Sequence, residues 1–329
     1  MYKFLILRPD RIGDAIITQV IIEALFKSVK CEIDVFASEY NHLFFKDNPF
    51  INQLFYCEIE NKKNLIKYYK NNCVAKIYDA IFILQSRKRI QKLALMNNCK
   101  YRIALDLIYD KSNIIKIYKF YMQRIKGFSF VEYNLNQHEV ISLQNVINCG
   151  LKKLSLSKII NLPNSCYLYN SLIKTSSTIK DSIVINFTGK KEDQRNILIS
   201  QLNYILEYVI DNGFSQIAII SDSSNIEELT IYLTSKYQNY KNKFHIYCEQ
   251  DIFIIINLIK CYEYFISCDG GLLHIAAAIK LKCVGLFNQN MINRWYPWTQ
   301  YQVSISNING VYAISPEEII QGLLKLKNL

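Results

Sequence analysis

The sequence is poor in residues that interrupt regular structure. Its 329 residues include five prolines and ten glycines, so most of the chain is expected to form helices and strands. The ten cysteines include no CxxC pair and no cysteine–histidine cluster at zinc spacing. We expect them to be reduced, buried side chains, which favours a reducing compartment.

Long apolar runs are also missing. No stretch approaches the about 20 apolar residues of a membrane-spanning helix. The apolar run after Met1 is too short for a secretory signal, because it leads directly into Arg8-Pro9-Asp10-Arg11. We therefore expect a cytoplasmic protein that at most docks on a membrane surface.

Basic residues outnumber acidic residues in the first half of the chain but not in the second. Residues 1–165 carry 25 Lys and Arg against 14 Asp and Glu, a net charge of +11, whereas residues 166–329 carry 14 of each. Residues 85–126 alone hold 11 basic side chains. Such a field attracts nucleic acid, acidic lipid head groups or phosphorylated glycans, unless it is only a solvated face. Nucleic acid is disfavoured because no RNA-binding signature or aromatic stacking platform accompanies the charge.

What is present is a repeated alternation of strand and helix patterns, with a Ser-, Lys- and Asn-rich linker at 151–180. The first half predicts strands at 3–7, 32–36, 53–56, 80–84 and 101–104, and helices at 15–28, 39–46, 63–71, 86–96 and 136–149, the last closed by Gly150. The second half predicts strands at 182–187, 216–221, 244–247, 264–267 and 283–287, and helices at 196–212, 225–236, 252–260, 272–279 and from 316. This pattern indicates two α/β domains with parallel sheets and a ligand-binding cleft between them.

Residues 111–126 mix bulky apolar residues with five basic ones. They are predicted to form either an amphipathic helix on an anionic membrane or an ordinary helix packed on its own sheet.

The most informative motif is Asp269-Gly270-Gly271-Leu272-Leu273-His274, between a predicted strand and a predicted helix. Glycines there let a ligand approach the backbone, and the helix N-terminus favours an anion. Asp269 and His274 add groups that can hydrogen-bond a sugar or nucleotide, although His274 also suits a buried core position. The motif predicts a nucleotide-type ligand.

A second motif, Arg8 to Asp14, follows the first predicted strand. Asp14 either caps the helix that begins there or faces the cleft as a general base that accepts a proton from a sugar hydroxyl. In the second half, the loop Thr188-Gly189-Lys190-Lys191 with Arg195 suits a phosphate, or is a basic surface loop. Asp222 follows another strand, where it holds a ribose or caps the next helix.

Together these motifs resemble glycosyltransferase family 9, the lipopolysaccharide heptosyltransferase family. The resemblance spans nearly the whole chain, and its other elements are Asn48-Pro49, His138-Glu139, and Leu286-Phe287 followed by Arg294-Trp295-Tyr296-Pro297-Trp298. One departure is Val20, where members often have proline.

The resemblance implies a GT-B fold, with two Rossmann-like domains whose parallel sheets face a central cleft. Residues 1–165 would bind the acceptor, residues 166–314 the nucleotide-sugar, and the helix at 315–329 would pack back on the first domain. The family inverts configuration and needs no metal or other cofactor. Asp14 matches the proposed base. The residues expected at the donor site are those that match the family's motifs, together with Asp222 from the strand pattern above. They are Thr188, Gly189, Lys190, Lys191, Arg195, Asp222, Asp269, Gly270, Gly271 and His274.

The charge map agrees with this division, because the basic half is the half expected to meet an anionic acceptor. Acceptor contacts are expected from Arg8, Arg11, Arg87, Lys88 and Arg89. The predicted function is transfer of heptose from ADP-heptose to a lipid-linked inner-core glycan of lipopolysaccharide, at the cytoplasmic face of the inner membrane. The alternatives are another nucleotide-sugar, a protein acceptor, or a non-catalytic sugar-nucleotide-binding scaffold.

Overall fold

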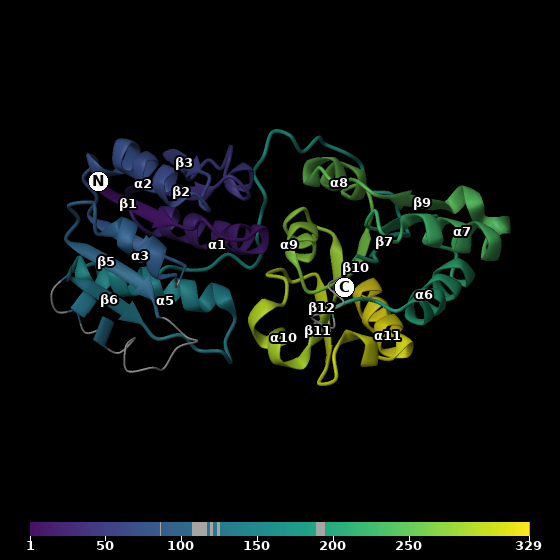
Figure 1. The fold of residues 1–329 in the computed structure, drawn as a ribbon. Coiled ribbons are helices and arrows are strands. Elements are labelled where there is room, and N and C mark those ends of the chain that lie inside the picture. Colours follow the sequence, from purple (N-terminus) through teal and green to yellow (C-terminus); the bar gives the residue numbers. More distant parts are fainter. Residues whose placement is uncertain (86, 107–116, 119–120, 124–125, 189–194, 329) are drawn as a thin grey trace. The chain divides into compact units, whose positions relative to one another are not determined.

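The computed structural model describes the whole chain except residues 86, 107–116, 119–120, 124–125, 189–194 and 329. The chain forms two compact units, Met1–Asn170 and Ser171–Leu329 (Figure 1), so the border lies slightly beyond the one predicted after residue 165. The basic segment 111–126 falls largely outside the described residues, and its two interpretations stay open. The cleft between the domains also stays a prediction.

The first unit is built on a six-stranded parallel sheet. Its strands are β1 Tyr2–Leu7, β2 Cys31–Ser38, β3 Gln53–Cys57, β4 Ala80–Ile83, β5 Tyr101–Leu105 and β6 Phe128–Val131. Their order is β3-β2-β1-β4-β5-β6, so the chain first builds outward from β1 and then returns to place β4 on its other side. The central strands are buried on both faces, which explains their continuous apolar runs. The edge strand β6 has a short, half-buried pattern and was not predicted.

Helices cover both faces of this sheet. They are α1 Ile12–Ser28, α2 Lys62–Tyr69, α3 Lys88–Ala94 and α5 Glu139–Lys153. Helices α2 and α3 share a core with Ile81 and Ile83, whereas α5 packs on Phe82, which points to the opposite face. Helix α1 packs beside α5. The helix predicted at 39–46 is only a single 3₁₀ turn, His42–Phe44.

Gly150 was predicted to close α5, but it lies buried inside this helix. A Cβ at this position would lie 2.9 Å from Cζ of Phe82 and 3.1 Å from Cδ1 of Ile103. The glycine is therefore needed because the helix approaches the sheet closely. The helix continues to Lys153, where Leu154 ends it.

The second unit repeats the architecture of the first. Its strands are β7 Ser182–Asn186, β8 Gln216–Ile220, β9 Phe244–Tyr247, β10 Tyr264–Cys268, β11 Lys282–Asn288 and β12 Gln302–Asn307. All neighbours are parallel, in the order β12-β11-β10-β7-β8-β9. The half-buried strand β12, with its polar sequence, was not predicted.

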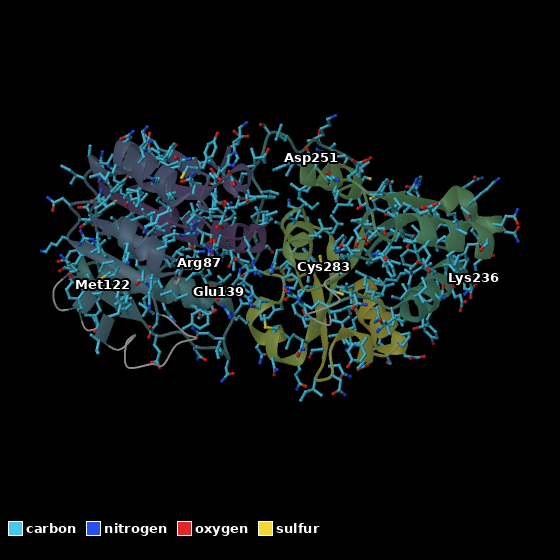
Figure 2. All side chains as sticks on the ribbon, viewed as in Figure 1. Arg87, Met122, Glu139, Lys236, Asp251 and Cys283 are labelled. Carbon is cyan, nitrogen blue, oxygen red and sulfur yellow. The ribbon has the colours of Figure 1, made fainter. Side chains whose placement is uncertain are left out.

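The second sheet is also covered on both faces. Its helices are α6 Ile199–Asp211, α7 Ile226–Lys236, α8 Ile252–Ile259, α9 Gly271–Ala278, α10 Gln289–Trp295 and α11 Pro316–Lys327, with 3₁₀ turns at Gln238–Lys243 and Val311–Ala313. One core joins α6, α7 and α11 to the sheet, and another joins α8 and α9 to its opposite face. Helix α10 was not predicted. Side chains fill these cores, among them Cys283 (Figure 2). All ten cysteines are free thiols, but only six are buried as predicted, and Cys57, Cys149, Cys248 and Cys261 are partly exposed.

The last helix, α11, begins as predicted but packs differently. Ser315 and Glu318 form a capping box, with Pro316 at the first position. Ile319, Leu323 and Leu326 are fully buried in the core of the second unit, where α11 lies against β11, β12 and α6. The apolar face of α11 is thus used on its own sheet, and the prediction that this helix packs back on the first domain stays a prediction.

The close approach of α5 to the sheet leads to a stability prediction. Gly150→Ala should destabilise the protein by about 1–3 kcal/mol, because the added methyl group overpacks the core. Phe82→Leu replaces the aromatic ring that this methyl group would meet with a smaller side chain. The double variant should therefore lose less stability than the sum of the losses in the two single variants. Urea unfolding of all three variants would measure this coupling, and simple additivity would contradict it.

Candidate functional site

The predicted site residues gather where the strand order of each sheet reverses. In the first sheet this crossing point lies between β1 and β4, and in the second between β7 and β10. Open parallel sheets bind ligands beyond the carboxyl ends of the strands at such points. Arg8 to Asp14 follow β1, Thr188 follows β7, and Asp269 follows β10.

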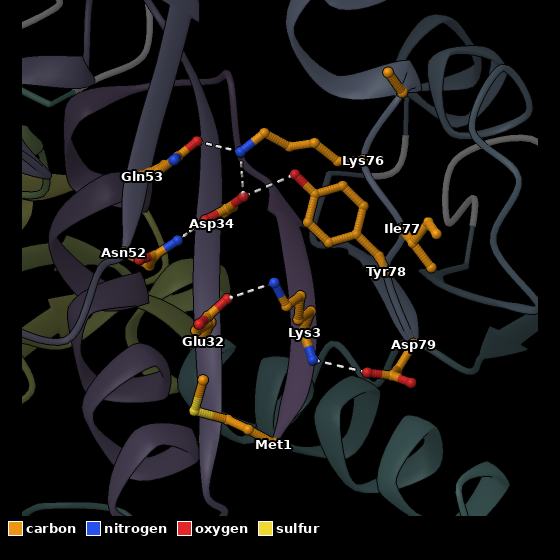
Figure 3. Close-up of a pocket in the computed structure, with 11 residues that line it drawn as sticks. Met1, Lys3, Glu32, Asp34, Asn52, Gln53, Lys76, Ile77, Tyr78 and Asp79 are labelled. Carbon is orange, nitrogen blue, oxygen red and sulfur yellow. Dashed lines mark hydrogen bonds and ion pairs between the residues drawn. The ribbon is translucent and has the colours of Figure 1, made fainter.

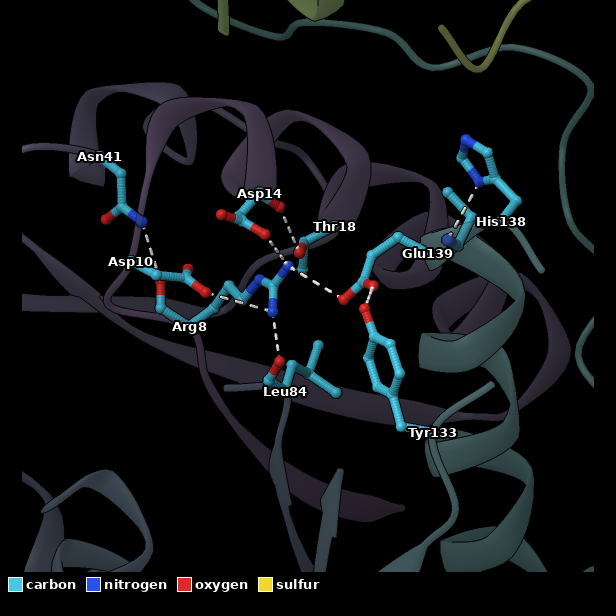
Figure 4. A network of polar contacts seen from close by, with 10 residues as sticks. Arg8, Asp10, Asp14, Thr18, Asn41, Leu84, Tyr133, His138 and Glu139 are labelled. Carbon is cyan, nitrogen blue, oxygen red and sulfur yellow. Dashed lines mark hydrogen bonds and ion pairs between the residues drawn. The ribbon is translucent and has the colours of Figure 1, made fainter. Parts of the chain in front are cut away.

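At the first crossing point a buried arginine holds three carboxylates (Figure 4). Nη2 of Arg8 lies 2.7 Å from Oδ1 of Asp14 and 3.9 Å from Oε1 of Glu139, and Nη1 lies 3.3 Å from Oδ2 of Asp10. Nη1 also donates to the carbonyl oxygen of Leu84, just beyond β4. The side chain of Arg8 is only 2% exposed, against 17% for Asp14. The guanidinium thus joins the ends of both central strands to the first turns of α1 and α5.

The local sequence explains how Arg8 and Asp14 are positioned. The backbone of Arg8 extends the sheet by one residue, since its N–H donates to Phe36, and its carbonyl accepts from Nδ2 of Asn41 at 2.8 Å. Helix α1 then starts without a side-chain cap, and Asp14 stands in its first turn, where the helix dipole favours a carboxylate. Because Asp14 pairs with Arg8, the cap interpretation of Asp14 is not what the structure shows.

Burial dominates the electrostatics of this cluster. Burial raises the pKa of Glu139 to about 7, although Arg8 opposes the change, and Asp14 adds to it. The pKa of Asp10 is raised well above its ordinary value, mainly by burial and again against the effect of Arg8. Burial by itself would lower the pKa of Arg8, but Asp10, Asp14 and Glu139 together raise it. The cluster therefore keeps Arg8 charged and retains a carboxyl proton near neutral pH.

The residues predicted to contact the acceptor divide into two groups. Arg8 is buried and engaged with the carboxylates, so it positions Asp14 instead of reaching a substrate. Arg11, Arg87 and Lys88 are exposed, and Arg89 is partly exposed. These four side chains are accessible, and their role in acceptor binding stays a prediction.

Sequence reasoning missed Asp10 and Glu139 as members of the site. Glu139 is the first residue of α5, after His138, whose Nδ1 accepts from the N–H of Val140. The hydroxyl of Tyr133 donates to Oε2 of Glu139. The pair His138-Glu139 was noticed as a motif, but only the fold shows that α5, far along the chain from Arg8, brings the carboxylate of Glu139 to that residue.

A second polar set lies at the crossing point of the second sheet. Nδ2 of Asn186, at the end of β7, donates to Oγ of Ser267 in β10 at 2.9 Å, and Oγ1 of Thr188 donates to Oδ1 of Asn186 at 2.6 Å. Nη1 of Arg195 lies 3.2 Å from Oδ2 of Asp269. Thr188, Arg195 and Asp269 therefore lie at one edge of the sheet, as predicted.

The Asp269-Gly270-Gly271 turn leads directly into α9. Gly270 has an extended φ of 166°, so its conformation does not require glycine, but a Cβ there would meet nothing within 4 Å. What glycine provides here is open space beside the helix N-terminus. His274, one turn later, is 3% exposed and meets the ring of Trp295 edge-on, with centroids 6.3 Å apart.

The remaining predicted donor residues have different outcomes. Oδ1 of Asp222 accepts hydrogen bonds from the N–H groups and side chains of Ser224 and Asn225, which lower the pKa of Asp222. Its carboxylate therefore organises the turn before α7, which agrees with the capping interpretation. Gly189, Lys190 and Lys191 lie outside the described residues.

A polar hollow of about 740 Å³ lies at the opposite edge of the sheet of the first unit (Figure 3). There Asp34 accepts from Tyr78 at 2.8 Å, Asn52 at 2.9 Å and Lys76 at 3.2 Å. Lys3 pairs with Glu32 at 3.1 Å. Because the charges that line this hollow neutralise one another, we infer that these residues stabilise the fold. The carboxylates around Arg8, in contrast, exceed the positive charge that they contact.

Two further findings concern the described residues only. They contain no group of three His, Cys, Asp or Glu side chains placed to hold a metal ion. They also contain no helix with the length and apolar character needed to cross a bilayer.

Comparison with known proteins connects this geometry to a family. The family model described as glycosyltransferase family 9 (heptosyltransferase) matches residues 174–318. None of the curated proteins matches the chain.

Solved structures of similar fold cover nearly the whole chain. A glycosyltransferase family 9 protein of Veillonella parvula has a TM-score of 0.75 at 13% identity, over 99% of this chain and 97% of its own. The E. coli ADP-heptose lps heptosyltransferase II has 0.70 at 16%, over 98% of each chain. The E. coli heptosyltransferase WaaC with ADP has 0.73 at 14%, over 98% and 99%. The GT-B fold predicted from the sequence is therefore confirmed.

The raised pKa of Glu139 has a testable consequence for stability. A carboxyl whose pKa rises from 4.5 to about 7 on folding stabilises the fold fully below the lower value, and this contribution is lost as pH rises through the upper one. Glu139→Gln cannot ionise, so at about pH 8 it should be more stable than the unmodified protein by about 1–3 kcal/mol, and nearly equal to it at about pH 5. Urea unfolding at both pH values measures the difference, and an equal effect at the two would refute the assignment.

Proposed function

We propose that this chain is a glycosyltransferase of family 9, whose family model matches residues 174–318, and that it transfers heptose from ADP-heptose to a hydroxyl of an anionic, lipid-linked glycan. The acceptor is the inner core of lipopolysaccharide or lipooligosaccharide, met at the cytoplasmic face of the inner membrane. The reaction inverts the anomeric configuration and uses no metal or other cofactor.

The observation that carries the proposal is the position of Asp14 at the first crossing point. It is the most exposed of the three carboxylates around Arg8, and Arg8 binds its Oδ1. This contact orients the side chain, and Oδ2 is the atom that takes the proton of the acceptor hydroxyl. The hydroxyl oxygen attacks the anomeric carbon as the bond from that carbon to the diphosphate breaks, and ADP leaves with the bonding electrons.

The leaving diphosphate gathers negative charge, which the second unit is suited to stabilise. Arg195 stands beside Asp269, and the N-terminus of α9 begins at the open space of Gly270. Lys190 and Lys191 of the predicted loop add two more cations. The presence of ADP in the named E. coli structure and of ADP-heptose in the name of the other supports the choice of donor.

Removing the proposed base tests the mechanism. Asp14→Asn keeps the size of the side chain but cannot accept the proton, so kcat with ADP-heptose and truncated lipooligosaccharide should fall by about 10²–10⁴-fold. Glu32→Gln, at the other edge of the same sheet, is the matched control and should retain full activity. If Asp14→Asn binds ADP normally and transfers as fast as the unmodified protein, Asp14 is not the base.

UDP- and GDP-sugars in the same assay test the alternative donors, and absence of transfer from any donor would favour the non-catalytic scaffold.

Donor binding can be tested separately from chemistry. Arg195→Gln should weaken ADP binding by about 10–100-fold, because a charge-assisted hydrogen bond to phosphate is lost. Lys282→Gln removes a cation that pairs with Glu263 at 3.4 Å at the amino end of β11, and it should bind ADP unchanged. Titration calorimetry with ADP measures both variants. Unaltered affinity in Arg195→Gln would place the diphosphate elsewhere.

A further inference from the structure

Helices α2 and α3 of the first unit leave a groove of about 280 Å³ between them. It is lined by Lys62, Leu65, Ile66, Arg89, Lys92, Leu93 and Met96. The lining positions are spaced by three and four residues on each helix, which places them along one side of each. The groove is therefore made mainly by one face of each helix, and Met96, in the turn just beyond α3, completes it.

The chemistry of the groove is divided between its floor and its rim. Leu65 and Leu93 are buried in the core beneath it, and Ile66 and Met96 are half-buried. The cations are Lys62, Arg89 and Lys92.

Among the residues that the structure describes, one acidic side chain forms an ion pair with this rim. Glu60 lies 3.9 Å from Arg89 and is 64% exposed, so this ion pair is solvated and weak. Within the described part of the chain, three cations around an apolar floor thus face the exposed carboxylate of Glu60.

Size and polarity together define the ligand. The volume is slightly below the about 300 Å³ at which pockets for drug-sized ligands begin, so the groove takes a fragment and not a whole nucleotide-sugar. An apolar floor disfavours a bare phosphate or sugar, and the cationic rim disfavours a neutral chain. We propose that this groove binds an anionic lipid of a membrane surface, with its head group at the cations and the first part of one acyl chain along the floor.

The direction of the helices adds a functional consequence. Helix α2 follows β3 and α3 follows β4, so Lys62 and Arg89, in their first turns, lie toward the carboxyl edge of the sheet. Asp14 lies at that edge, and Met96 lies beyond the other end of α3. A lipid held in this way would bring the membrane surface to the side of the first unit that carries the proposed base. The inference goes beyond the proposed transfer and does not depend on the identity of the donor or the sugar.

Methionine provides a direct probe of the groove. The chain has four methionines, of which Met96 lines the groove and Met291 lies in the second unit. In the full-length protein with ¹³C-methyl methionine, octyl phosphate below its micellar concentration should shift the Met96 signal saturably and leave Met291 unchanged. Octanol has only the alkyl chain and inorganic phosphate has only the anionic group, so each should bind at least about tenfold more weakly than octyl phosphate.

Matched charge reversals connect the groove to membranes. Lys62→Glu with Lys92→Glu reverses two cations of the rim, and Lys67→Glu with Lys70→Glu reverses two exposed cations of α2 and its following turn outside the groove. Co-sedimentation with vesicles of phosphatidylcholine and phosphatidylglycerol in equal parts should fall by at least about tenfold for the first pair and about twofold for the second. Ile66→Trp, which fills the groove and keeps its charge, should abolish the Met96 response.

Two results would overturn the inference. If inorganic phosphate binds as tightly as octyl phosphate, or the Met96 signal does not respond, the groove holds no lipid chain. If both charge-reversal pairs lose vesicle binding equally, the attraction belongs to the whole basic surface. The Met291 signal and the unfolding temperature verify that each variant is folded. Because binding is measured without a sugar donor, failure of the groove is distinguishable from failure of the proposed transferase reaction.

Discussion

The pairing of buried Arg8 with three carboxylates is the interaction on which the organisation of the first unit depends. A guanidinium without water is costly unless its charge and N–H groups are matched. Here Asp10, Asp14 and Glu139 surround the charge with three carboxyl groups, and the carbonyl of Leu84 accepts one N–H. The contact joins β1, the end of β4, α1 and α5 at the crossing point. The same interaction therefore fixes the position of the proposed base and holds the ends of the two central strands together.

The second unit uses the same strand order with a different polar chemistry. An arginine again reaches across the two central strands, from Arg195 after β7 to Asp269 after β10, and Asn186 and Ser267 connect the strands directly. In the first unit the excess of carboxylates favours holding and accepting protons. In the second, the hydroxyl of Thr188, the guanidinium and the N-terminus of α9 favour an anion. One architecture thus carries two polar chemistries, as the proposed transfer from a nucleotide-sugar requires.

The two edges of the first sheet show why charge balance, and not pocket size, distinguishes the candidate site. At the amino edge, the hollow of about 740 Å³ is lined by Asp34, Glu32, Lys3 and Lys76, which pair among themselves. At the carboxyl edge, three carboxylates share Arg8, and burial raises the pKa of Glu139 to about 7. A balanced network rigidifies the fold, whereas an unbalanced one retains a proton near neutral pH, which suits acid–base chemistry.

The sequence by itself determined the α/β class, most strands and the motifs at the strand ends, because strands buried on both faces and glycines at turns have strong local signals. It did not determine the half-buried edge strands β6 and β12, whose patterns are short or polar. Only the tertiary structure brought Glu139 to Arg8 and placed α11 on its own sheet. It also showed that Gly150 serves helix–sheet packing and that Arg8 is a buried ion and not a surface contact. These outcomes depend on which faces meet across long separations in the chain, and local residue patterns do not contain that information.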